Sequence, residues 1–307
     1  MSDDRRLPSW NDGPTRDALI EFLDAADSLP VGDRVAVFDN DGTLWCEKPE
    51  YPQLLFMLDE LARAVAADPT IASRAEFRAL IERDIAAQVE IGLERIALAL
   101  LELCAGISPE EFNARVVSFF DRSRHPDRGV PFLDLRYQPM LELLDELRSH
   151  RFDVYLVTGG GAEFVRAISR RFYAVSPDAV VGSLVDYEFV RDDGGRPALV
   201  RTKELFGHVN EGPPKVSNIQ LQLGRRPIFA AGNSPGDAEM LEYAIAGTGP
   251  SMALLVDHDD AEREYAYEGR AGSFETDGSF EETARGLGIT VVSMRSDWAS
   301  VFPPTSP

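Results

Sequence analysis

The feature that most constrains this chain is a run of four apolar residues, Val35 to Phe38, that leads directly into the polar segment DNDGT, residues 39–43. An apolar run of this length predicts a strand buried on both faces, as in a parallel sheet. At the end of a buried strand, Asp39 and Asp41 would repel each other and lose hydration unless a cation or a shared proton compensated them. The segment therefore indicates a site that holds a compensating positive charge.

The order of the expected elements separates this first strand from the rest of the sheet. The pattern is almost wholly helical over residues 47–138, whereas later apolar strands, such as 153–158 and 227–232, alternate with helices. Such alternation predicts an α/β fold with a parallel sheet and helices on both faces. We expect a core of residues 1–46 and 139–307, and an inserted all-helical cap of residues 47–138.

Two further segments carry distinct local signals. YEFVRDDGGRPALVRT, residues 187–202, holds two alternating runs around an Asp-Gly-Gly turn, which predicts a β-hairpin. IAAQVEIGLERIALALLELC, residues 85–104, is the most apolar helix candidate. Glu90, Glu94 and Arg95 interrupt it, so it predicts a packed helix and not a membrane span.

Composition limits the class of partner. The 307 residues include 52 acidic and 31 basic side chains, so the net charge of -21 disfavours nucleic acid and anionic membrane surfaces as partners. A phosphorylated ligand would meet the same repulsion unless cations or backbone N–H groups bound it locally. Cys46 and Cys104 give no disulfide framework, and residues 1–14 lack the apolar segment of a secretion signal. The expected compartment is the cytoplasm.

Polar residues cluster after three of the expected strands, where ligands bind in open parallel sheets. In the first cluster, Asp39 and Asp41 could serve as a nucleophile or metal ligand and as a proton donor, if their surroundings separate their pKa values. A turn capped by aspartates is the alternative. An EF-hand calcium loop fits poorly, because Leu44 stands where that loop needs glycine and a strand precedes it.

The second cluster is LVTGGGAEFVRA, residues 156–167. It offers the Thr158 hydroxyl and glycine N–H groups at the start of a helix, which suits an anion such as phosphate. A plain strand-to-helix turn that needs glycine is an open alternative. A dinucleotide-binding turn, and with it a nucleotide-dependent oxidoreductase, fits less well because Phe164 replaces the last glycine of that motif.

The third cluster is PIFAAGNSPGDAEML, residues 227–241. It places Asn233, Ser234 and Asp237 in a turn whose oxygen atoms could reach Mg²⁺. Helix capping by Ser234 or Asp237 is the alternative.

A bound phosphoryl group also requires a cation. Lys203 and Lys215 are the only lysines after Lys48. Lys215 is the better candidate, because a short helix would carry it towards the strand ends.

Together the three clusters resemble the motifs of the haloacid dehalogenase superfamily, specifically its phosphatases similar to phosphoserine phosphatase with a helical C1-type cap. The pattern is D-x-D-G-T after an apolar strand, a threonine ending a second strand, a lysine, and G-N-S-x-x-D after a further strand, over about residues 35–241. The resemblance implies a Rossmann-like core and a phosphoric monoester hydrolase acting on a small phosphorylated metabolite.

The same resemblance implies roles for the matching residues. Asp39 would attack phosphorus to form an aspartyl-phosphate, while Asp41 would protonate the leaving oxygen and then activate water. The residues that would hold the phosphoryl oxygens are Thr158, Gly159 and Lys215. The positions that would bind Mg²⁺ are Asp39, the Asp41 backbone carbonyl, Asn233 and Asp237.

Some positions bear on the choice among superfamily activities. Asn233 replaces an aspartate that many relatives carry, and an amide oxygen binds Mg²⁺ less strongly than a carboxylate. Asp41 favours a phosphatase over the dehalogenases, which lack this acid. Trp45 and Glu47 are candidates for substrate specificity.

A non-catalytic sensor of a phosphorylated ligand and a phosphotransferase or mutase are alternatives with the same fold.

Overall fold

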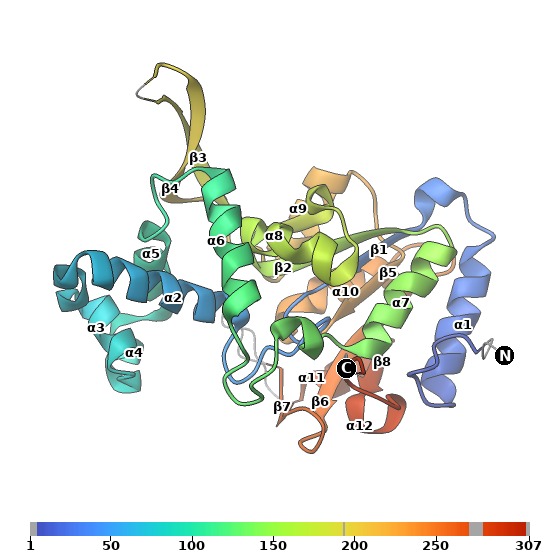
Figure 1. The fold of residues 1–307 in the computed structure, drawn as a ribbon. Coiled ribbons are helices and arrows are strands. Elements are labelled where there is room, and N and C mark those ends of the chain that lie inside the picture. Colours follow the sequence, from blue (N-terminus) through green and yellow to red (C-terminus); the bar gives the residue numbers. More distant parts are fainter. Residues whose placement is uncertain (1–4, 193, 270–278, 305–307) are drawn as a thin grey trace.

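The computed structural model describes residues 5–192, 194–269 and 279–304. A sheet runs through its centre in the strand order β4-β3-β2-β1-β5-β6-β7, with β8 paired to β6 (Figure 1). The strands are β1 (Val35–Phe38), β2 (Asp153–Gly161), β3 (Val180–Arg191), β4 (Pro197–Phe206), β5 (Phe229–Gly232), β6 (Met252–Asp259), β7 (Ala266–Tyr267) and β8 (Thr290–Ser293). The inner pairs are parallel, whereas β3–β4 and β6–β7 are antiparallel.

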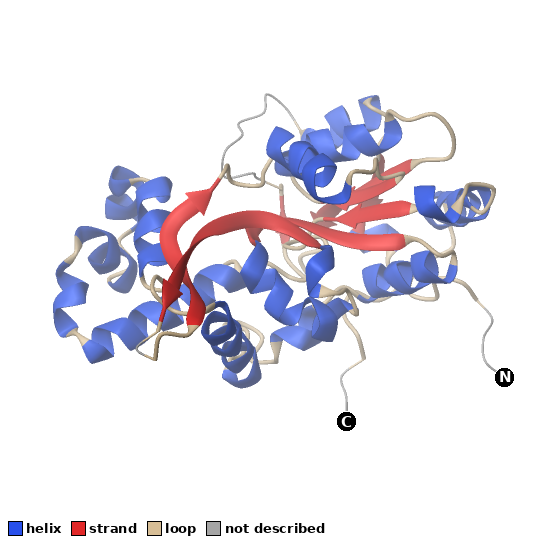
Figure 2. Cartoon of the chain, turned by 90° about the horizontal axis from the view of Figure 1, so that it is seen from above, coloured by secondary structure: helices blue, strands red, loops and turns tan. Residues whose placement is uncertain are grey.

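Helices cover both faces of this sheet (Figure 2). Those of the α/β part are α1 (Pro14–Ala26), α7 (Gln138–Ser149), α8 (Ala162–Tyr173), α9 (Pro213–Leu223), α10 (Ala238–Ile245), α11 (Phe280–Gly286) and α12 (Met294–Asp297). On β1, Ala36 and Phe38 join a buried cluster with α1, α7 and α8, whereas Val35 and Val37 join a second cluster with α9, α10 and α11. Side chains alternate in this way because successive residues of a strand point to opposite faces. The predicted Rossmann-like α/β fold is confirmed.

The carboxyl ends of three neighbouring strands meet at one edge of the sheet. In the register, Phe38 of β1 lies beside Leu156 of β2 and Ala231 of β5. The residues that follow these positions therefore leave the sheet together, as expected for parallel strands.

Residues 47–138 form a group of helices at one side of the sheet (Figure 1). They are α2 (Pro52–Ala67), α3 (Ala75–Ile81), α4 (Ile85–Ile91), α5 (Leu93–Glu102) and α6 (Pro109–Arg122). We call this segment the helical insertion. It has the expected helices, and its independence as a cap domain stays a prediction.

Strands β3 and β4 form the predicted hairpin, which extends beyond the sheet beside the helical insertion (Figure 1). Asp193, in the turn, lies outside the described residues. Two backbone hydrogen bonds tie the hairpin to the loop between α5 and α6: Gly106 N–H donates to Arg201 O at 2.8 Å, and Arg201 N–H donates to Ile107 O at 2.9 Å. The hairpin and the helical insertion therefore contact each other directly.

The single helix predicted over residues 85–104 is wrong. The helix is interrupted at Gly92, which has φ of +90° and separates α4 from α5. Glycine adopts this conformation at little cost, whereas other residues avoid it. Among the helices of the described segments, none has the length and apolar character needed to span a membrane.

Candidate active site

The charged centre of the site is Lys215, which α9 carries to the carboxyl edge of the sheet. Its Nζ lies 2.7 Å from Asp39 Oδ1 and 2.5 Å from Asp237 Oδ1. All three side chains are buried. The structure thus brings together residues from three distant segments, whereas Lys203 is exposed on β4.

Two carboxylates share one ammonium group in this centre, which leaves one negative charge uncompensated. Burial, and then the charge of Asp237, raises the pKa of Asp39 well above its ordinary value, although Lys215 acts in the opposite direction. Burial alone would lower the pKa of Lys215, but attraction to Asp237 and Asp39 raises it above its ordinary value. Lys215 therefore stays charged, and an additional cation beside Asp39 would be stabilised.

Asp41 lies next to this centre in a different environment. Its Oδ1 accepts a hydrogen bond from Trp45 Nε1 at 2.8 Å. Burial, and then the nearby charge of Glu47, raises the pKa of Asp41 to about 6. Asp41 can therefore hold or release a proton near neutral pH, as an acid and base must.

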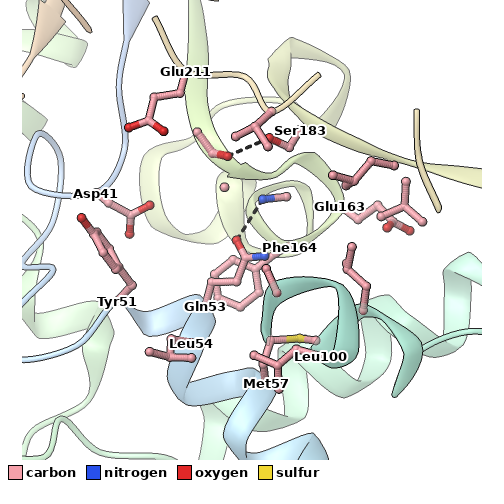
Figure 3. A pocket seen from close by; sticks show the side chains of 18 of the residues that line it. Asp41, Tyr51, Gln53, Leu54, Met57, Leu100, Glu163, Phe164, Ser183 and Glu211 are labelled. Carbon is pink, nitrogen blue, oxygen red and sulfur yellow. Dashed lines mark hydrogen bonds between the residues drawn. The ribbon is translucent and has the colours of Figure 1, made fainter. Parts of the chain in front are cut away.

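The three glycines after Thr158 are the last residues of β2, which extends beyond the predicted strand 153–158 and leads directly into α8. Thr158 is fully buried, and its Oγ1 accepts a hydrogen bond from Gly160 N–H at 3.0 Å. Gly161 N–H donates to Gln53 Oε1 of the helical insertion at 2.9 Å, as Figure 3 shows. A side chain from the helical insertion therefore reaches the glycine segment that was predicted to bind an anion.

In the turn after β5, the two carboxylate oxygens of Asp237 contact different groups. Asp237 Oδ2 accepts hydrogen bonds from the backbone N–H groups of Asn233 and Ser234 at 3.0 and 3.1 Å, while Oδ1 faces Lys215. Ser234 and Asp237 also form a capping box, so the capping interpretation describes part of this turn. Both oxygens of Asp237 are already engaged by protein groups.

A cavity of about 430 Å³ opens over these residues. Several residues predicted for the site line it, namely Asp39, Asp41, Glu47, Gly159, Lys215 and Asn233. Thr158, Asp237 and Trp45 do not belong to the described residues that line it. Trp45 instead packs against Phe120 and Phe172 behind Asp41, so its ring contributes to the core.

Comparison with known proteins assigns the family. A family model described as haloacid dehalogenase-like hydrolase matches residues 36–242. The chain belongs to this family. The matched range contains all three polar clusters, so the resemblance to haloacid dehalogenase-like hydrolases is confirmed.

Two solved structures with TM-scores above 0.5 support the same fold. This haloacid dehalogenase-like chain is similar to a protein with unknown function from Bordetella pertussis Tohama I, with 20% identity, a TM-score of 0.51, and coverage of 84% of this chain and 97% of that chain. It is also similar to a conserved functionally unknown protein from Anaerococcus prevotii DSM 20548, with 14% identity, a TM-score of 0.52 and 94% coverage of each chain. A probable phosphoserine phosphatase from Vibrio cholerae has 13% identity and a TM-score of 0.43, over 90% of this chain and 73% of that chain. No curated protein matches the sequence.

The oxygen atoms of this haloacid dehalogenase-like site fit a hard divalent cation. Across the described segments, no three His, Cys, Asp or Glu side chains form a metal-binding group, so ligands must include other oxygens. Thr43 Oγ1 lies 3.3 Å from Asp39 Oδ2 and 3.4 Å from Asn233 Oδ1, which places these two oxygens near each other. Gly42 allows this arrangement, because a Cβ there would lie 2.0 Å from Asn233 Nδ2. Mg²⁺ binds oxygen ligands, and the Asp39 carboxylate would be a stronger ligand than the Asn233 amide.

His258 is a residue of this site that the sequence reasoning missed. It is buried at the end of β6, with Nε2 2.8 Å from Gly42 O and Nδ1 3.2 Å from Glu264 Oε2. A carbonyl oxygen only accepts, so Nε2 carries a proton and donates to the turn that bears Asp39 and Asp41. The signal was present in MALLVDHDD, where an apolar strand again ends in polar residues. His258 positions the turn from a fourth strand end.

Proposed function

We propose that this protein is a Mg²⁺-dependent phosphatase that hydrolyses a small phosphomonoester through an aspartyl-phosphate. The observation that carries the proposal is Lys215 held between Asp39 and Asp237 at the strand ends, with Asp41 beside them. Phosphoryl transfer depends mainly on positioning and on compensation of negative charge. A buried carboxylate next to a fixed ammonium group meets both requirements.

In the first half of the reaction, a carboxylate oxygen of Asp39 attacks phosphorus and the bond between phosphorus and the ester oxygen breaks. Asp41, in its protonated form, gives its proton to that oxygen, which leaves as an alcohol. In the second half, the Asp41 carboxylate accepts a proton from water while the water oxygen attacks phosphorus and Asp39 leaves. The pKa of about 6 at Asp41 suits both steps, because each form of the group is accessible near neutral pH.

The phosphoryl oxygens would be held by Lys215, the Thr158 hydroxyl and the Gly159 N–H. Lys215 supplies the positive charge, and the start of α8 supplies a favourable backbone dipole. Lys215 and Gly159 line the cavity, whereas Thr158 is fully buried and does not line it, so the proposal requires the Thr158 hydroxyl to become accessible when a phosphoryl group binds.

Mg²⁺ would be held by the Asp39 carboxylate, the Asp41 carbonyl and the Asn233 amide oxygen. When bound, it offsets the negative charge of Asp39 and of the phosphoryl group. We assign Asp237 a different role from the one implied by the resemblance. Because its oxygens contact Lys215 and the turn N–H groups, Asp237 positions Lys215.

The test is a screen of phosphorylated metabolites for release of inorganic phosphate, with Mg²⁺ and with a chelator. Wild type should release phosphate only with the metal. Asp39→Asn should lose activity by about 10⁴-fold or more, since no nucleophile remains. Circular dichroism and thermal unfolding would verify that this variant is folded. Full activity of Asp39→Asn would refute the nucleophile, and ligand binding without phosphate release would favour the sensor.

A further inference from the structure

The cavity that holds the charged centre continues into a compartment with apolar walls. The helical insertion and the hairpin supply most of its apolar side chains, which include Leu54, Met57, Leu100, Leu101, Val185 and Leu205. Figure 3 shows Leu54, Met57 and Leu100 together on the side of the cavity formed by α2 and α5. We call this part of the cavity the apolar compartment.

The basic group in the wall of the apolar compartment is already compensated. Arg201 is buried, its Nε lies 2.8 Å from Glu163 Oε2, and its Nη1 donates to Cys104 O at 2.9 Å. Its guanidinium also lies 4.1 Å from the ring centroid of Phe112. Among the described residues that line the cavity, Arg201 and Lys215 are the only lysines or arginines. Neither offers a free positive charge to a second anionic group on a substrate.

Acidic residues also line the cavity. Glu47, Glu163 and Glu211 line the same cavity, and Glu47 and Glu163 are paired with Lys48 and Arg201, so the described lining residues offer no unpaired cation to a carboxylate or second phosphate on the leaving group. A hydrocarbon chain would instead replace water along apolar walls. The lining therefore favours an apolar leaving group over one that carries a second negative charge.

We propose that the substrate is the phosphomonoester of an uncharged, mainly apolar alcohol, whose carbon chain occupies the apolar compartment. This inference rests on the proposed phosphatase function and adds its substrate class. Burial of each methylene should raise kcat/KM about fourfold until the compartment is filled. Phosphoserine, whose carboxylate and ammonium group would both lose hydration against the apolar walls, should be a poor substrate.

The experiment compares n-butyl, n-hexyl and n-octyl phosphate with glycerol phosphate and phosphoserine, below the concentrations at which the longer esters form micelles. We expect kcat/KM to rise along the alkyl series and to be lowest for phosphoserine. p-Nitrophenyl phosphate provides a general measure of phosphatase activity.

A matched pair of variants tests the wall itself. Leu101 of α5 lines the cavity and is partly buried, whereas Leu98 of the same helix is 39% exposed and is not among the lining residues. Leu101→Asn should reduce the dependence of kcat/KM on chain length, and it should lower hydrolysis of p-nitrophenyl phosphate less than that of octyl phosphate, because the ring covers less of the wall. Leu98→Asn should leave both unchanged.

The outcomes separate the two proposals. Phosphate release that is independent of chain length, or fastest with phosphoserine, would overturn the apolar substrate and leave the phosphatase intact. An equal change of slope in Leu98→Asn and Leu101→Asn would also overturn it. No release from any ester would remove the proposed function and this inference with it.

Discussion

The two ends of the cavity are built from different parts of the molecule. At the charged end, Asp39, Lys215 and Asn233 come from segments next to β1 and β5, and ion pairs or hydrogen bonds fix each of them. At the apolar end, side chains of the helical insertion and the hairpin meet, and their contacts carry little directional constraint. The difference separates bond breaking, which needs fixed geometry, from choice of the leaving group, which needs only a wall of suitable shape and polarity.

After the loss of the nucleophile in Asp39→Asn, the largest effect should come from Lys215→Met at the charged end. Loss of the ammonium group leaves Asp39 and Asp237 as unpaired buried carboxylates, so we expect the free energy of unfolding to fall by about 3–5 kcal/mol. kcat/KM should fall about 10³-fold, and by the same factor for butyl and octyl phosphate. Urea unfolding and phosphate release measure the two effects.

Lys203→Met is the matched control, because Lys203 is exposed on β4. Lys203→Met should change neither the free energy of unfolding nor kcat/KM. A loss in Lys215→Met that varied with chain length would show that the two ends of the cavity do not act separately.

A smaller effect is expected for His258→Gln, which acts on the charged end through the turn at Gly42. The variant leaves the buried Glu264 with a weaker partner, which should cost about 1–3 kcal/mol of unfolding free energy. kcat should fall more than KM changes, and equally for polar and apolar esters, because the turn positions Asp39. His208→Gln, at an exposed position, provides the control. Unchanged kcat in a destabilised His258→Gln would limit His258 to a role in stability.

The smallest effect concerns the protonation of Asp41. Its pKa is raised in the folded state, so between about pH 4 and 6 the folded protein binds more protons than the unfolded chain, and stability decreases as pH rises. Asp41→Asn removes this contribution. Relative to wild type in chelator, the variant should gain about 1–2 kcal/mol of unfolding free energy from pH 4 to pH 7.

Urea unfolding at several pH values provides this measurement. Glu21→Gln, which alters an exposed carboxylate on α1, should show a difference from wild type that is small at every pH. A pH-independent difference for Asp41→Asn would contradict the raised pKa, and with it the role of Asp41 as a proton donor near neutral pH.

Much of the charged end could be predicted from the sequence. An apolar run followed by polar residues marks the end of a buried strand, and parallel strands place such ends side by side. This reasoning located the segments of Asp39, Thr158 and Asn233, and the helix before β5 located Lys215. It could not show that Asp237 Oδ1 contacts Lys215, because that depends on how α9 packs against the turn after β5, whereas the capping contacts of Oδ2 are local.

The sequence by itself determined the α/β alternation, the helical insertion, the hairpin and the strand ends that carry polar residues. Each of these features follows from the local periodicity of apolar residues or from turn residues. Only the tertiary structure decided that Gln53 reaches Gly161, that His258 holds Gly42, and that the hairpin and the helical insertion enclose an apolar compartment. The physical reason is that these contacts join residues far apart in the chain. Their partners are selected by packing in three dimensions, which no local pattern encodes.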